Sequence, residues 1–173
     1  MFLVAACNYK NGIDSNIYCE RFKFSCTQKN IVVYFKTSKG IMEVELYGKD
    51  NPVTVSNFLD NVDKNIYSNQ KFYKIINYPQ VSFIHGGVNT RERFDDDRNQ
   101  ILNKLRPSIP LEIKFKGEIK PRYNYQIKNP NEIENLVNTF ENGSLAMVKS
   151  GKNKSSSTEF FFVTSKIPEL DGR

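Results

Sequence analysis

The sequence contains no tryptophan, a single histidine and only three cysteines among its 173 residues. The lone His85 rules out a zinc site built from several histidines, and no cysteine has zinc-ligand spacing to it. A Ser-His-Asp triad would have to use His85, but no G-x-S-x-G segment is present. No apolar run approaches 18 residues, so nothing in the chain as given spans a membrane.

Other catalytic signatures are equally sparse. Asp95–Asp97 is a run of acids in a polar stretch, which is more typical of a solvated turn than of a metal site. Gly86-Gly87 is too short for a phosphate-binding loop, and no pair of carboxylates stands out for acid–base chemistry. We therefore expect no metal and no cofactor. Standard hydrolytic and redox classes are poorly supported.

The composition favours one globular domain with a modest tail, because 39% of the residues are hydrophobic and 13% are aromatic. The net charge is +6, and residues 101–130 hold most of it, with seven Lys or Arg against two Glu, a local charge of +5. Such a stretch can contact nucleic acid or an anionic surface. No nucleic-acid motif accompanies it, so we interpret it as a solvated basic region and expect no nucleic-acid partner.

Residues 1–29 are interpreted as an N-terminal leader or tail. Val4-Ala5-Ala6-Cys7 resembles a bacterial lipobox, although no Lys or Arg precedes it and the apolar run is short. If Cys7 carries a lipid, Cys19 and Cys26 remain as a pair that could form a disulfide in an oxidising compartment. A cytoplasmic chain with three free thiols is the alternative. A periplasmic or lipid-anchored location is favoured only slightly.

From residue 30 onward the pattern indicates short strands with one clear helix. Asp50-Asn51-Pro52 is a helix start, and apolar residues then recur at helical spacing towards residues 63–65. Residues 88–142 form a long, basic insert with little periodicity, in which Asn131–Val137 is a possible short helix. Ser150–Thr158 is expected to be a polar loop. The predicted strands are Ile31–Phe35, Met42–Leu46, Lys71–Ile76, Val81–His85, Ile109–Phe115, Gly143–Lys149 and Glu159–Thr164.

These residues leave room for a pocket with apolar walls and a few hydrogen-bond donors. Such a site binds a peptide or catalyses a reaction that needs no nucleophile. Rotation about an X-Pro bond is a reaction of that kind, since its barrier comes from amide resonance. An enzyme need only hold the proline and aim a donor that binds the twisted state better than the planar one.

Several segments, in order along the chain, carry a resemblance to the cyclophilin-type peptidyl-prolyl cis-trans isomerases, particularly bacterial members. The resemblance covers about residues 30–173, the expected domain. The segments are KGIMEVELY (Lys39–Tyr47), NPVTVSNFLDNV (Asn51–Val62), FYKII (Phe72–Ile76), FIHGG (Phe83–Gly87), GSLAM (Gly143–Met147), EFFFVT (Glu159–Thr164) and LDGR (Leu170–Arg173).

The resemblance implies a mainly β fold, a closed antiparallel β-barrel of about eight strands capped by two helices. It also implies a groove on the outside of the barrel that binds proline-containing polypeptides. By position, Lys74 and His85 take the catalytic places. The substrate-binding places fall to Phe72, Phe83, Val148, Lys149, Phe161 and Leu170.

This chain departs from the family pattern at the groove itself. Lys74 replaces an arginine, which keeps the charge but loses the planar fork of donors, so we expect weaker catalysis. His85 replaces a glutamine and could change charge between about pH 5 and 8. Ser82 stands where an aromatic residue is usual, and Glu169 occupies a tryptophan-or-aromatic position, which predicts poor cyclosporin binding. In the family a further strand follows the segment that resembles Leu170–Arg173, and the sequence up to Arg173 contains no counterpart of it.

Three functions remain open at this stage. The first is a prolyl isomerase that assists protein folding, monomeric and without a cofactor. The second is a non-catalytic cyclophilin-like domain that binds proline-containing segments as a chaperone or scaffold. A basic surface module that uses residues 101–130 is the most distant.

Overall fold

Short strands dominate the part of the chain that the computed structural model describes, residues 14–88 and 107–173. In chain order the elements are α1 (Ser15–Phe22), β1 (Ile31–Thr37), β2 (Gly40–Leu46), α2 (Pro52–Asp63), β3 (Lys74–Tyr78), β4 (Val81–Gly87), β5 (Ile109–Pro110), β6 (Glu112–Ile113), β7 (Arg122–Tyr123), the 3₁₀ helix η1 (Pro130–Asn135), β8 (Leu145–Gly151), β9 (Lys154–Val163) and the 3₁₀ helix η2 (Pro168–Leu170). The expected mainly β character is confirmed.

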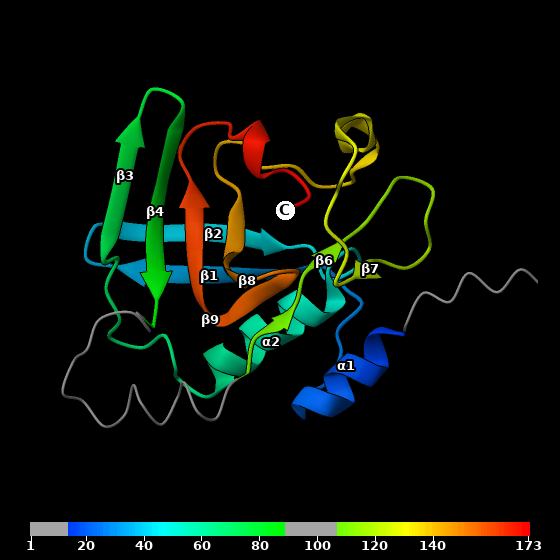
Figure 1. Ribbon diagram of the computed structural model, residues 1–173. Helices are drawn as coiled ribbons and strands as arrows, with labels where there is room; N and C mark the ends of the chain where they lie inside the picture. The colour runs from blue at the N-terminus through cyan, green and yellow to red at the C-terminus, as the bar shows by residue number, and fades with distance from the viewer. Residues whose placement is uncertain (1–13, 89–106) are drawn as a thin grey trace, which may run out of the picture.

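The described strands form three antiparallel sheets (Figure 1). The largest has the order β3-β4-β9-β5, and β8 also pairs with β9. β1 and β2 form one hairpin, and β6 and β7 form another small pair. Within these residues the strands do not join into the closed barrel that the resemblance implies.

The hydrophobic core lies between the large sheet, the β1–β2 hairpin and α2. Burial alternates along β1, as expected for a strand with one solvated face. The apolar positions of α2 recur at helical spacing and place Val55 and Phe58 against Leu46 of β2 and Phe160 of β9. The predicted helix after Asn51 is thereby confirmed, and it ends at Asp63 within the expected range.

The N-terminus of α2 is capped differently from the sequence interpretation. Asn51 occupies the N-cap position, but its side chain makes no capping hydrogen bond. Instead, the Glu112 carboxylate accepts hydrogen bonds from the Val53 and Thr54 amides at 3.1 and 2.8 Å. The negative charge of a carboxylate is also stabilised by the helix dipole at this end. The cap comes from a residue far along the chain, which local pattern reading cannot identify.

Residues 150–158, expected as a polar loop, belong largely to strands. β9 begins at Lys154, and the side chains of Ser155–Thr158 are buried. Their polar groups find partners inside the fold, because the Asn57 and Asn61 amides donate to the Ser157 carbonyl at 2.8 and 2.6 Å. Satisfied hydrogen bonds make burial of a polar strand tolerable.

Part of the segment interpreted as a leader or tail forms the helix α1. The Asp14 carboxylate caps α1, and Tyr18 and Cys19 pack on Val53 of α2. A Cys19–Cys26 disulfide ties the helix to the loop that follows, which is the pairing considered from the sequence. Cys7 and the lipobox-like segment lie outside the described residues. The domain boundary at residue 30 stays a prediction.

Three basic side chains in the described part of the insert are paired with acids. Lys114 contacts Asp50 at 2.9 Å and Lys120 contacts Asp14 at 3.1 Å. Arg122 pairs with Glu118 and places its guanidinium 4.4 Å from the centre of the Phe115 ring. These contacts give the stretch a structural role. Lys104 and Arg106 lie outside the described residues.

Candidate functional site

Strand register aligns three of the predicted site residues across the large sheet. Lys74 of β3 lies opposite His85 of β4, and His85 lies opposite Phe161 of β9. On the far side Phe161 lies opposite Ala146 of β8. Directly opposed residues in antiparallel strands share a face. Lys74, His85, Phe161 and Ala146 therefore form one row on a single face, which we call the groove face.

Aromatic rings surround His85 on this face. The Phe83 ring stacks on the imidazole with centroids 4.8 Å apart and an interplanar angle of 21°. Phe161 lies at 5.8 Å, and Tyr73 meets the imidazole edge-on at 6.0 Å. Lys74 at the end of the row is exposed. The face thus combines a cationic donor, a half-buried imidazole and apolar rings, all beside solvent.

An apolar cluster continues from Phe161 and includes two more predicted residues. Val148 and Phe161 are each 7% exposed and pack with Val163 and Ile167. Phe83 and Leu170 pack against the same cluster from its partly exposed side. The structure therefore brings six of the eight predicted residues together: Lys74, His85, Phe83, Val148, Phe161 and Leu170.

Phe72 and Lys149 are placed elsewhere. Phe72 precedes β3 and meets Phe160 and Phe162 edge-on, at 6.4 and 6.1 Å, on the opposite face of the sheet. Lys149 follows an irregularity in the pairing of β8, and it borders a separate cavity. Neither side chain belongs to the row.

The two glycines after His85 allow β4 to lie close to β9. A Cβ on Gly86 would come within 2.8 Å of the Phe160 ring. A Cβ on Gly87 would collide with the Thr158 carbonyl oxygen, and Gly87 has φ +87°. Both the close approach and the left-handed backbone require glycine. These glycines therefore shape the site sterically.

Residues that sequence reasoning did not select also reach this face. Glu159 is 6% exposed, precedes Phe161 by two positions in β9, and accepts a hydrogen bond from the Tyr73 hydroxyl at 3.0 Å. The signal that could have identified Glu159 is its position at the start of the apolar strand segment EFFFV, because a buried acid needs specific partners. Phe140 stacks on Phe161 at 5.8 Å and 11°, and no local pattern marks it.

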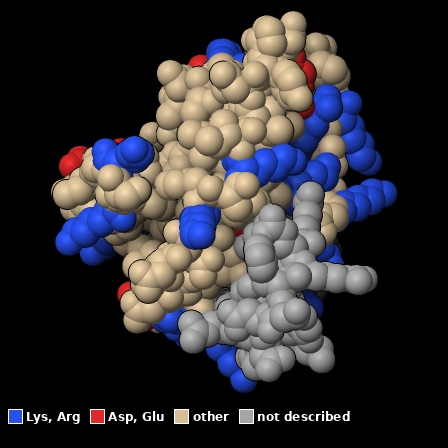
Figure 2. Space-filling view, turned by 90° about the vertical axis from the view of Figure 1, so that its left-hand side faces the viewer, with Lys and Arg blue, Asp and Glu red and all other residues tan. Residues whose placement is uncertain are grey.

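Basic side chains are prominent on the side of the molecule where β3 lies. Figure 2 shows Lys and Arg spread over this surface, with few Asp or Glu among them. β3, with its exposed Lys74, is on this side (Figure 1). The groove face therefore lies next to a surface of largely one sign of charge.

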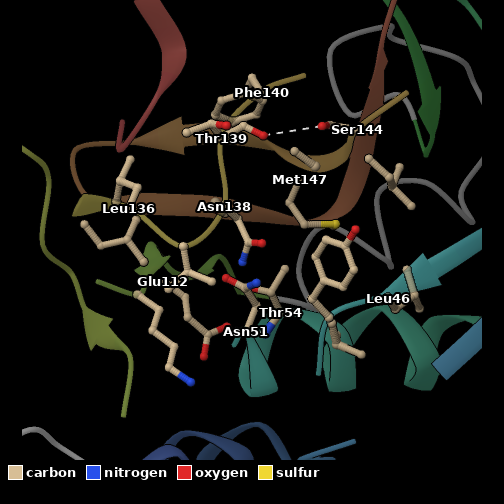
Figure 3. A pocket seen from close by; sticks show the side chains of 18 of the residues that line it. Leu46, Asn51, Thr54, Glu112, Leu136, Asn138, Thr139, Phe140, Ser144 and Met147 are labelled. Atoms are coloured by element: carbon tan, nitrogen blue, oxygen red, sulfur yellow. Dashed lines mark hydrogen bonds between the residues drawn. The ribbon is translucent and has the colours of Figure 1, made fainter. Parts of the chain in front are cut away.

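A cavity of about 610 Å³ lies between α2, β2 and β8, and of the row only Ala146 lines it (Figure 3). Its apolar lining includes Leu46, Leu136 and Met147. Glu112 and Thr54 lie together in it, and burial raises the pKa of Glu112 to about 7. Lys74, His85, Phe83 and Phe161 are not among its lining residues. The cavity is thus distinct from the part of the row formed by Lys74, His85 and Phe161, although Lys149 and Phe140 border it.

Metal-binding clusters and membrane-spanning helices are both absent from the described part of the chain. No group of three or more His, Cys, Asp or Glu residues there is arranged to hold a metal ion. No helix in residues 14–88 and 107–173 is long and apolar enough to cross a membrane.

Comparison with known proteins bears on the whole domain. A family model described as cyclophilin type peptidyl-prolyl cis-trans isomerase/CLD matches residues 32–173. A similar solved structure is the cyclophilin AquaCyp293 from Hirschia baltica, with a TM-score of 0.53 and 16% identity. The alignment covers 93% of this chain and 68% of that one, and at this identity it supports the fold alone. The chain therefore belongs to the cyclophilin-type peptidyl-prolyl cis-trans isomerase family.

Proposed function

We propose that this protein is a peptidyl-prolyl cis-trans isomerase that acts on proline-containing polypeptides at the groove face. The observation that carries the proposal is the cross-strand row of Lys74, His85 and Phe161. A cationic donor on the same face as apolar rings supports the proposal, because it is a combination suited to rotation about an X-Pro bond. Membership of the family supports the same reaction class.

In this mechanism the substrate proline ring packs against Phe83 and Phe161, whose centroids lie 5.6 Å apart. Lys74 donates a hydrogen bond to the proline amide, and His85 donates to or accepts from the neighbouring backbone. Twisting the amide removes its resonance and leaves the nitrogen a better acceptor, so a fixed donor stabilises the twisted state more than the planar ones. No covalent intermediate forms.

Weak catalysis is part of the proposal. A lysine ammonium gives a single flexible hydrogen bond, whereas an arginine would offer a rigid fork of donors. Lys74 is also exposed, so water competes for its ammonium group. Lys74→Arg should therefore raise the isomerase rate.

A protease-coupled assay on an X-Pro peptide tests the proposal. Wild-type protein should exceed the uncatalysed rate, Lys74→Ala should fall towards it, and Lys74→Arg should exceed wild type. Lys36→Ala is a matched control, because Lys36 is another exposed strand lysine but belongs to the β1–β2 hairpin. If wild type, Lys74→Ala and the uncatalysed reaction have equal rates, the isomerase proposal is wrong.

The alternative is a non-catalytic domain that binds proline-containing segments as a chaperone or scaffold. The exposed lysine in the donor position favours it, because binding needs the apolar rings but not a rigid donor. Binding of the same peptide, measured by calorimetry without rate enhancement, would support this alternative.

The closed barrel also remains a proposal. Consecutive residues of β2, including Val44 and Glu45, line the large cavity, as do Leu145 and Ala146 of β8. Successive strand residues point to opposite faces, so a lining that includes both indicates that the strand edge borders the cavity. We propose that a further strand pairs there and closes the barrel.

The cellular compartment is also part of the proposal. The Cys19–Cys26 disulfide supports an oxidising compartment for this protein.

A further inference from the structure

Phe140 extends the aromatic surface of the groove face beyond the residues predicted from the sequence. Its ring lies nearly parallel to Phe161, with centroids 5.8 Å apart and an interplanar angle of 11°. Phe140 comes from the segment that leads into β8, whereas His85 reaches Phe161 from β4. Since β9 pairs with both β4 and β8, Phe140 and His85 approach Phe161 from opposite sides.

The backbone of Phe140 is held at both of its polar groups. Its amide donates to the Asp171 carboxylate at 2.7 Å, and its carbonyl accepts from the Ile167 amide at 3.0 Å. Asp171 is 4% exposed and Ile167 is 1% exposed. Burial raises the pKa of Asp171, and the hydrogen bond from Phe140 opposes that shift. Asp171 of the LDGR segment therefore holds the Phe140 backbone, and with it the position of the Phe140 ring.

Phe140 retains accessible surface despite this anchoring. It is half-buried, it packs against the apolar cluster that contains Val148 and Phe161, and it also lines the cavity between α2, β2 and β8. The partly accessible Phe140 ring, parallel to Phe161, offers an apolar surface beside it, which we call the Phe140–Phe161 platform. Such a platform suits another apolar or aromatic side chain, which gains from area burial and from ring contacts.

We propose that Phe140 is a specificity-determining residue, and that the Phe140–Phe161 platform receives an apolar or aromatic residue immediately before the substrate proline. Asp171 acts as a positioning residue by holding the Phe140 backbone. The choice of that substrate position follows from Val148, which shares the cluster and which, by the resemblance to the cyclophilin family, would lie along the groove edge beside the residue before proline. This inference rests on the proposed function, because it concerns the same groove.

Two X-Pro peptides that differ only in having Phe or Ala before the proline provide the test. Wild-type protein should show a kcat/KM, or a binding constant if turnover is slow, about three- to tenfold better for the Phe peptide. Phe140→Leu should remove most of this preference through KM, and the Ala peptide should be nearly unaffected. Phe140→Tyr keeps the ring and should keep the preference.

Control variants separate recognition from folding. Phe22→Leu changes a similar pair, because Phe22 stacks on Phe24 at 5.9 Å and 7° in a different part of the fold. It should leave the peptide preference unchanged. Asp171→Ala should weaken the preference, whereas Asp171→Asn retains an oxygen acceptor for the Phe140 amide and should restore it. Melting curves would verify that each variant is folded.

The outcomes distinguish this inference from the proposed function. If wild-type protein acts on X-Pro peptides and folded Phe140→Leu keeps the full preference, the role of Phe140 is refuted while the isomerase proposal stands. An equal loss for both peptides would also refute it, because that pattern indicates a general structural effect. If wild-type protein neither binds nor isomerises either peptide, both proposals fail.

Discussion

The two faces of β9 use the same residue type for different purposes. Phe160 and Phe162 point into the core formed with β1, β2 and α2, whereas Phe161 between them points to the groove face. Strand geometry alone produces this division, because successive side chains alternate. The comparison shows that a run of three phenylalanines is two structural features, and that position in the run decides which one a mutation affects.

The surroundings of the two faces differ accordingly. Phe160 meets Phe35 of β1, Phe58 of α2 and Tyr67 at centroid distances of 5.7, 5.8 and 5.3 Å. Phe161 meets Phe83, His85 and Phe140 at 5.6 to 5.8 Å. The rings around Phe160 join separate elements of the core. Among those around Phe161, His85 lies opposite the exposed Lys74 on the neighbouring strand.

The largest expected effect is on the core side of this comparison. Phe160→Ala should reduce the free energy of unfolding by about 3–5 kcal/mol, because it leaves a cavity among rings from several elements. Phe161→Ala should cost less stability but abolish action on X-Pro peptides. Chemical denaturation and the protease-coupled assay measure the two effects. Equal stability losses with unchanged activity for Phe161→Ala would remove the functional distinction between the faces.

The next test concerns the close contact between β4 and β9, the paired strands that carry both the core side and the groove face. Gly87→Ala should destabilise the protein by about 2–4 kcal/mol, since it combines a clash at Thr158 with an unfavourable positive φ. Gly117→Ala is the matched control, because Gly117 has φ +79° and a Cβ added to it would meet nothing within 4 Å. It should cost only about 1–2 kcal/mol. Similar losses in thermal melts would show that the clash is unimportant.

A pH-dependent effect on stability is expected from Glu112 on the core side. Burial raises the pKa of Glu112 from 4.5 to about 7, despite two amide hydrogen bonds that oppose the shift. The folded state therefore holds this proton more tightly than the unfolded chain. Stability should be greatest below about pH 4.5 and fall by up to about 3 kcal/mol as the pH rises to about 7.

Glu112→Gln should flatten this profile, as measured by urea unfolding across pH 4 to about 8. The exposed Glu134→Gln should leave it unchanged. Peptide binding at the groove face should not follow the same titration, because Glu112 borders the cavity instead. A stability profile that stays sloped in Glu112→Gln would assign the titration to another group.

The smallest stability effect is expected for Lys74, the exposed residue at the end of the row on the groove face. Lys74→Arg exchanges one exposed side chain for another and should change the free energy of unfolding by less than about 0.5 kcal/mol. Its isomerase rate should nevertheless rise, because the guanidinium offers a fork of donors. Melting and activity measured on one sample check both points. A change in stability without a change in rate would make Lys74 a structural residue.

Much of the candidate site could be predicted because it depends on local alternation. Once β3, β4 and β9 are recognised, Lys74, His85 and Phe161 follow from period-two reading and the family resemblance. Phe72 could not be placed in this way, because β3 begins at Lys74 and the alternation does not extend back to it. Lys149 falls outside the row for a related reason, since the pairing of β8 shifts around it, and its role in substrate binding stays a prediction.

The sequence by itself determined α2, parts of most strands and the residues that alternate along them, because these depend on spacing and propensity between near neighbours. Only the tertiary structure decided that Glu112 caps α2, that Ser155–Thr158 are buried, and that Asp171 holds Phe140 against Phe161. Each of these joins residues distant in the chain. Such contacts form only when packing brings the elements together, and no local pattern records which buried polar group will meet which partner.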